Sequence, residues 1–214
     1  MVLENFTFPF LRNAILPRSS WRPFPPASDR EAWNRLLENP SIRTIRDGIV
    51  KTAERFRETD WPALPATLHM TFVRNRDRAS FEKPYFERRS RLGVFVLAEC
   101  MEYRGRFLDD VIDGLWLIGE ETTWAINAHS FKKRMENGQD PLPSTAEETL
   151  DLFSTLTAFE IAEADFLLGA ELERVTPSIR ERVHLLIESR IFATFERYPD
   201  EMHGWMGGGN NWTP

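Results

Sequence analysis

Apolar residues recur at helical spacing along most of this 214-residue chain. The segment from Ser41 to Arg57 is typical, because its large apolar side chains fall on one helix face: Ile42, Ile45, Ile49, Ala53 and Phe56. No segment shows the two-residue alternation of a half-buried strand. The pattern therefore predicts an all-α fold built from successive helix pairs.

Capping and breaking residues predict where these helices begin and end. Ser28–Glu31 is a capping-box pattern and predicts a short helix through about Glu38, after which Asn39–Pro40 breaks it. A second box at Ser144–Glu147 predicts a helix that reaches about Leu168. Thr176–Pro177 begins a helix that runs to about Arg197. The remaining predicted helices span residues 66–74, 81–103 and 107–119, and a mixed stretch covers 124–144.

The first 27 residues differ from the rest of the chain, because prolines forbid regular pairing while aromatic side chains favour burial. The prolines are Pro9, Pro17, Pro23, Pro25 and Pro26, and the aromatic residues are Phe6, Phe8, Phe10, Trp21 and Phe24. We predict an irregular arm over residues 1–27 that packs on a helical domain spanning 28–214.

Composition excludes several classes of function. The net charge of −6 gives no general attraction to nucleic acid, and no apolar run approaches the ~20 residues that span a bilayer. The single Cys100 excludes an internal disulfide, and the scattered histidines have no metal-ligand spacing, so neither a metal nor a cofactor is predicted. The N-terminus is a poor signal peptide, which predicts the cytoplasm, with the periplasm as the alternative.

The residues from Gly204 to Pro214 form the first candidate site. Three consecutive glycines favour neither helix nor strand, and they suit a place where backbone passes close to a ligand. Amide and indole side chains around them can hydrogen-bond to a sugar and stack on it. The candidate binding residues here are His203, Trp205, Asn210, Asn211 and Trp212. The alternative is a flexible tail.

A second candidate site lies in the segment Glu120–His129, where carboxylate, indole, amide and imidazole groups come together after a helix end. Its candidate binding residues are Trp124, Asn127 and His129. The basic stretch from Arg74 to Arg91 has two interpretations, a solvated helix face, which the pattern favours, and the wall of an anion-binding groove.

These two candidate segments together resemble a known family. Trp124-Ala125-Ile126-Asn127-Ala128-His129 after a Glu-rich helix end, followed by Gly209-Asn210-Asn211-Trp212-Thr213-Pro214, is similar to the N-terminal α/α toroid of heparinase II/III-like polysaccharide lyases. The resemblance covers roughly residues 30–214 and implies helical hairpins curved into part of a toroid, an incomplete barrel. It also implies an acidic, uronate-containing polysaccharide as the substrate, cleaved by β-elimination.

The resemblance assigns roles to single residues. Asn211 matches the amide that neutralises the uronate carboxylate, a catalytic role. Trp212 stands where the family places a histidine; an indole is not a base but is suited to stacking on a sugar ring. None of Tyr85, Tyr103 and Tyr198 occupies the place of the family's proton-donating tyrosine. The chain is therefore expected to be the front part of a toroid, inactive alone, and its open edge predicts a homodimer.

Two alternatives to a lyase stay open. The first is a non-catalytic carbohydrate-binding helical module that uses its tryptophans for stacking. The second is a helical interaction protein that binds no sugar.

Overall fold

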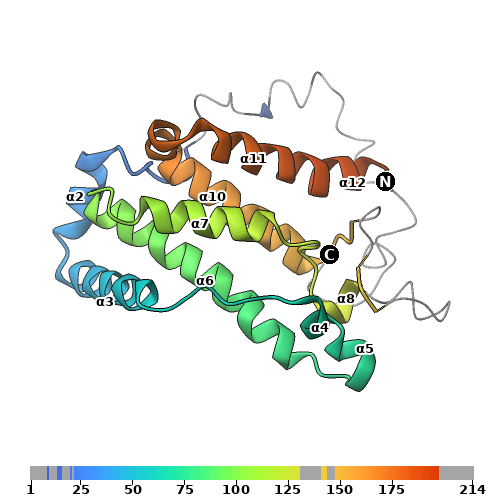
Figure 1. The fold of residues 1–214 in the computed structure, drawn as a ribbon. Coiled ribbons are helices and arrows are strands. Elements are labelled where there is room, and N and C mark those ends of the chain that lie inside the picture. The colour runs from blue at the N-terminus through green and yellow to red at the C-terminus, as the bar shows by residue number, and fades with distance from the viewer. Residues whose placement is uncertain are drawn as a thin grey trace.

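A computed structural model of the chain describes residues 22–130, 141–143 and 148–197, together with positions 9, 14–15 and 20. Every regular element in these ranges is a helix (Figure 1), which confirms the predicted all-α class. Within them no helix is long and apolar enough to cross a membrane.

The helices follow the predicted order with shifted ends, except that the single helix predicted over residues 66–74 is two short helices. They are α2 (Arg30–Leu37), α3 (Pro40–Arg57), α4 (Ala66–His69), α5 (Thr71–Asn75), α6 (Ala79–Glu102), α7 (Leu108–Gly119), α8 (Asn127–Ser130), α10 (Leu152–Val175), α11 (Pro177–Ile187), a π-helical segment η2 (Glu188–Phe192) and α12 (Ala193–Arg197). The helix predicted from Thr176–Pro177 to Arg197 is therefore made of α11, η2 and α12 in direct succession, with the π-helical stretch in the middle.

Two predicted helix starts need correction. The N-cap of α2 is Asp29 rather than Ser28, because the Asp29 carboxylate accepts a hydrogen bond from the Ala32 amide at 3.1 Å. Residues 148–151 are not helical, so the predicted continuous helix from Ser144 is wrong. The capping box that begins α10 consists of Asp151 and Ser154, and the helix extends to Val175. Residues 144–147 lie outside the described ranges.

Four long helices form two hairpins that stack side by side. Tyr85 and Tyr103 of the α6 hairpin contact Thr157 and Glu171 of α10 in the same order along both helices, so α6 and α10 run parallel. α7 returns antiparallel to α6, and α11 returns antiparallel to α10 (Figure 1). The second hairpin therefore repeats the orientation of the first, with α7 and α11 packed against each other.

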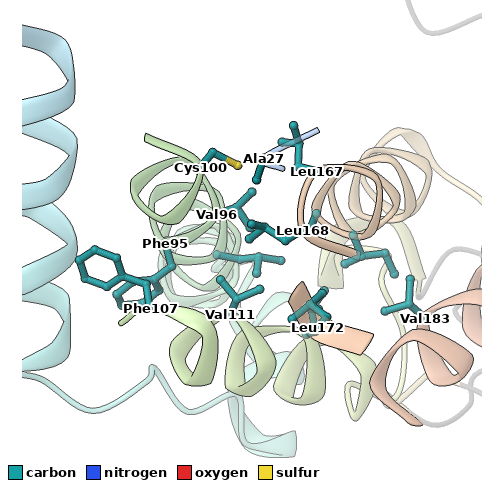
Figure 2. Close-up of a cluster of buried hydrophobic side chains, with 14 of the residues drawn as sticks. Ala27, Phe95, Val96, Cys100, Phe107, Val111, Leu167, Leu168, Leu172 and Val183 are labelled. Atoms are coloured by element: carbon teal, nitrogen blue, oxygen red, sulfur yellow. The ribbon is translucent and has the colours of Figure 1, made fainter. Parts of the chain in front are cut away.

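The main hydrophobic core lies between these hairpins (Figure 2). Its largest contributions come from residues that the apolar periodicity places on the inner faces: Phe95, Val96, Val111, Leu168, Leu172 and Val183. The Cys100 thiol lies in this core, and burial raises its pKa to about 12, which leaves the thiol protonated and unreactive at neutral pH.

The described end of the N-terminal arm packs on the body as predicted. The Phe24 ring contacts Phe166 edge to face at 5.5 Å, and the Ala27 amide donates to the Leu167 carbonyl at 2.8 Å. Apart from positions 9, 14–15 and 20, residues 1–21 lie outside the described ranges.

Several large apolar side chains on α10, α11, η2 and α12 are exposed, among them Phe159, Leu185, Phe192 and Phe195. The homodimer stays a prediction.

A pair of glycine substitutions tests the packing of α7. A Cβ atom on Gly114 would lie 2.9 Å from Trp61 Cη2 and 3.2 Å from Leu92 Cδ1. Because the Trp61 ring is held against Phe95, it has little room to move. Gly114→Ala is therefore expected to lower the free energy of unfolding by about 1–3 kcal/mol, measured by urea denaturation.

The matched control is Gly48→Ala on the exposed surface of α3, where no atom lies within 4 Å of the new Cβ. Alanine is the better helix former, so this variant is expected to gain about 0.5–1 kcal/mol. Stabilisation of both variants would contradict the packing described for α7.

Candidate functional site

The segment from Thr123 to His129 lies at the end of the helical body where α6 and α10 begin and α7 ends (Figure 1). It connects α7 to α8, and it contacts α6 through Tyr85 and α10 through Asp151. Ser130, which follows it, contacts α4 through His69. The second candidate site of the sequence therefore lies where four helices meet.

Trp124 is part of the core in this structure. Its side chain is 1 % exposed, its indole Nε1 donates to the Ile118 carbonyl at 2.9 Å, and its carbonyl accepts from the Tyr85 hydroxyl at 2.6 Å. The guanidinium carbon of Arg190 lies 4.9 Å from the ring centroid. Stacking on a sugar requires an open ring face, so the geometry gives Trp124 a structural role instead of the predicted binding role.

Asn127 is also buried, with 0 % exposure. Its Nδ2 reaches the Asp77 carbonyl at 3.5 Å, and its Oδ1 has no hydrogen-bond partner among the residues that the structure describes. Asn127 thus ties α8 to the turn before α6, and its amide is not open to a polysaccharide.

His129 is the one of these three predicted residues that reaches the surface. Its side chain is 37 % exposed, and its Nδ1 lies 2.6 Å from Asp151 Oδ2. A carboxylate only accepts hydrogen bonds, so the Nδ1–H donates to Asp151. This contact fixes the tautomer and leaves Nε2 without a partner in the described ranges, where it is available to a ligand.

Asp151 and His69 are site residues that the sequence did not single out. Asp151 Oδ1 caps α10 through the Ser154 amide while Oδ2 holds His129, so the carboxylate orients both the helix and the imidazole. His69 is 6 % exposed and its Nε2 lies 3.0 Å from Ser130 Oγ. The pattern could have indicated Asp151, because an Asp followed three residues later by Ser is a helix start.

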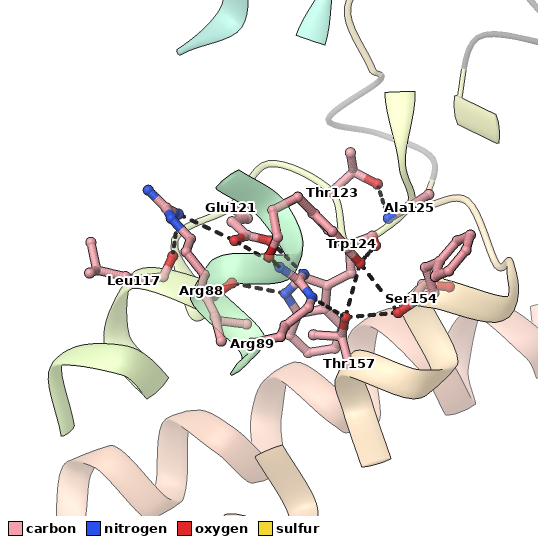
Figure 3. Close-up of polar contacts among 12 residues, drawn as sticks. Arg88, Arg89, Leu117, Glu121, Thr123, Trp124, Ala125, Ser154 and Thr157 are labelled. Carbon is pink, nitrogen blue, oxygen red and sulfur yellow. Dashed lines mark hydrogen bonds and ion pairs between the residues drawn. The ribbon is translucent and has the colours of Figure 1, made fainter. Parts of the chain in front are cut away.

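A buried ionic network lies beneath this surface (Figure 3). Arg89 Nη2 lies 2.8 Å from Glu121 Oε2, and Arg88 Nη1 lies 3.2 Å from Glu121 Oε1. Arg89 Nε also donates to Thr157 Oγ1, which joins Tyr85. Burial raises the pKa of the Tyr85 hydroxyl, so this tyrosine stays protonated and serves as a hydrogen-bond donor to Trp124.

The network corrects the interpretation of the basic stretch. Arg88, Arg89 and Arg91 are buried, so the favoured solvated face is wrong for this part of α6. Arg91 is held by the Thr59 and Asp60 carbonyls and by Glu87, away from the candidate site. Arg74, Arg76 and Arg78 are exposed as the pattern predicted.

The first candidate site of the sequence falls outside the described residues: His203, Trp205, Asn210, Asn211 and Trp212. Their predicted roles stay predictions. In the described ranges no group of three or more His, Cys, Asp or Glu side chains is arranged to hold a metal ion.

No protein-family model matches this chain, and no curated protein is significantly similar to it in sequence. The resemblance to heparinase II/III-like lyases therefore stays a prediction that depends on the two quoted motifs.

The buried imidazole of His69 makes stability depend on pH. Burial lowers the pKa of His69 below its usual value of 6.5, and the Pro141 carbonyl opposes this in part. Below about pH 6.5 the unfolded chain therefore binds a proton that the folded chain resists, so stability is lost as the pH falls through this range. His69→Gln is expected to flatten the decline in urea midpoint between about pH 7 and about pH 5. An unchanged slope would show that His69 does not carry this dependence.

Proposed function

We propose that this end of the helical body binds uronate-containing polysaccharide, as the helical domain of a heparinase II/III-like lyase. The observation that carries the proposal is the exposed imidazole of His129, oriented by Asp151, at the same end of the body as a pocket lined by His69 and Arg88. Ser130 joins the two parts, since it follows His129 and contacts His69. An oriented imidazole and a guanidinium group at the same end of the body suit a sugar that carries hydroxyls and a carboxylate.

The arrangement of the hairpins supports the toroid part of the proposal. The α6–α7 and α10–α11 hairpins stack with like helices parallel, which is how helical repeats propagate into a curved double layer. Loops and helix ends of such a layer gather at one end, and the candidate site lies there (Figure 1).

The chemistry of β-elimination assigns His129 a role. The uronate C5–H bond breaks and its proton moves to a base, the electron pair forms the C4–C5 double bond, and the C4–O bond breaks with a proton passing to the leaving oxygen. His129 Nε2 is the base that we propose. Asn211, outside the described residues, is the donor that we propose for the carboxylate.

The described tyrosines do not supply the acid. The Tyr85 hydroxyl is buried and donates to the Trp124 carbonyl, and the Tyr103 hydroxyl donates to Glu171 beyond the far end of α6. We therefore expect this chain to bind uronate oligosaccharides without turning them over at an appreciable rate.

Calorimetric titration with size-matched oligosaccharides tests the proposal. Alginate, heparin and heparan sulfate oligosaccharides are expected to bind at least ~10-fold more tightly than neutral malto-oligosaccharides, which lack the carboxylate. Ultraviolet detection of unsaturated uronate products accompanies the titration. Equal affinity for charged and neutral sugars contradicts the proposed substrate class, and robust product formation contradicts our placement of the acid.

His129 is expected to contribute directly to this binding. His129→Ala removes one neutral hydrogen bond to the sugar, so the dissociation constant for alginate oligosaccharide should rise by ~2–10-fold. The control is His184→Ala on α11, whose imidazole contacts Asp165 away from this end of the body and should leave the affinity unchanged. Equal effects of the two substitutions on affinity would show that His129 does not contact the sugar.

One observation favours the alternative of a helical interaction protein. An open groove of about 760 Å³ runs along α10 and α11, with the apolar side chains of Phe24, Phe159 and Ile187 in its lining. The titration described above distinguishes the two, since a chain that binds no uronate oligosaccharide supports an interaction protein and a chain that binds one supports the lyase-like domain.

A further inference from the structure

A half-open pocket of about 440 Å³ lies between α4, the start of α6 and the end of α7. Its volume is in the range of small-molecule sites. The apolar lining includes Leu64, Phe81 and Leu142, and the polar lining includes His69, Arg88, Glu120, Glu121 and Thr123. A pocket with an apolar wall and a few polar groups matches the two faces of a sugar ring.

Arg88 has one nitrogen left for a ligand. Its Nε donates to the Pro62 carbonyl at 2.7 Å, and its Nη1 contacts Glu121 at 3.2 Å and the Leu117 carbonyl at 3.4 Å. Its Nη2 makes no hydrogen bond with a described residue. Because the rest of the side chain is held in place, Nη2 is a preorganised donor.

Arg88 shares its carboxylate partner with a second arginine. Glu121 is shared by Arg88 and Arg89, and its closer contact, 2.8 Å, is to Arg89. These three side chains sum to +1, and Glu160 also interacts electrostatically with Arg89, so Arg88 has the weaker carboxylate contact of the two arginines. A carboxylate in the pocket would give Arg88 a partner of its own. Glu120 also lines the pocket from an exposed position, and its charge opposes an anion.

Neutral groups complete the pocket. Burial keeps the pKa of His69 low, so its imidazole is uncharged at neutral pH. Its Nε2 contacts Ser130 Oγ and its Nδ1 is buried, so the ring adds an uncharged surface to the pocket. Thr123 Oγ1 accepts from the Ala125 amide at 3.2 Å, which leaves its hydroxyl proton free to donate. The Thr123 hydroxyl suits a hydroxyl of a sugar.

We propose that this pocket is a subsite for one uronate residue, whose carboxylate accepts a hydrogen bond from Arg88 Nη2. The inference rests on the proposed function and gives it a location for the charged group of the sugar. Phe81 and Leu64 contact the apolar ring face, and Thr123 binds a hydroxyl.

The test uses the full chain at low ionic strength, with sodium glucuronate as the probe and glucose as the neutral control. Heteronuclear NMR of the arginine side chains follows Arg88. Glucuronate is expected to shift the Arg88 signals and to bind at least ~10-fold more tightly than glucose, since glucose leaves the guanidinium unpaired. Equal affinities, or an unmoved Arg88 signal, overturn the proposal.

Two variants separate binding from folding. Arg88→Met keeps the Arg89–Glu121 pair and should weaken glucuronate binding by ~10-fold or more. Glu120→Gln, at an exposed position, removes the opposing charge and should tighten binding by ~2–5-fold even if the first variant fails to fold. Glu58→Gln on α3 is the control and should change nothing. An unchanged or weakened affinity in Glu120→Gln contradicts the subsite.

The two proposals fail separately. If uronate oligosaccharides bind while glucuronate leaves Arg88 unmoved, the subsite is wrong and the proposed function stands. If glucuronate binds at Arg88 while no oligosaccharide binds, the subsite stands and the proposed function is wrong.

Discussion

Glu121→Ala is expected to lower the free energy of unfolding by about 3–5 kcal/mol. The side chain is 5 % exposed and contacts both Arg88 and Arg89. Its removal takes the ion-pair partner from two buried guanidinium groups, so much of their desolvation is no longer offset. Urea denaturation followed by circular dichroism measures the change.

The matched control is Glu31→Ala, which removes an exposed Glu–Arg pair on α2. Exposed pairs contribute little because solvent screens them, so this variant should unfold within ~1 kcal/mol of the parent. Similar effects of the two substitutions would contradict the structural role of the buried network.

Trp124→Ala is expected to lower the free energy of unfolding by about 3–5 kcal/mol as well. The substitution removes a fully buried ring and its hydrogen bond to Ile118, and it leaves a cavity under Arg190. Trp116→Ala on α7 is the control, because that ring is 47 % exposed and its truncation should cost much less. The same denaturation experiment compares them.

This comparison also decides between the two roles of Trp124. A tryptophan that stacks on sugar at an open site would leave stability almost unchanged when replaced, and would weaken binding instead. A large loss of stability supports the buried position.

The sequence predicted the long helices well because their apolar residues repeat with the helical period. α3, α6 and α7 begin and end within about two residues of the predicted limits, which is the usual precision of such boundaries. The start of α10 was not predicted because Ser144–Glu147 and Asp151–Ser154 are both plausible caps, and local pattern does not choose between them. The π-helical stretch at Glu188–Phe192 has no signature in apolar periodicity.

The candidate site was predicted in part. The segment Glu120–His129 was found because polar and aromatic groups cluster there, but clustering does not tell which side chains face inward. Trp124 and Asn127 turned out to be buried because α6 and α10 close over them, which depends on contacts far apart in sequence. The His69–Ser130 contact joins residues 61 positions apart, and periodicity carries no such information.

Titration of the chain with a uronate oligosaccharide, located by NMR, tests the account most directly. We expect saturable binding that shifts the signals of His129 and Arg88 and leaves those of His184 unchanged. A size-matched neutral oligosaccharide should shift none of them at the same concentration. Binding confined to the groove along α10 and α11, or no preference for the uronate sugar, would contradict the account.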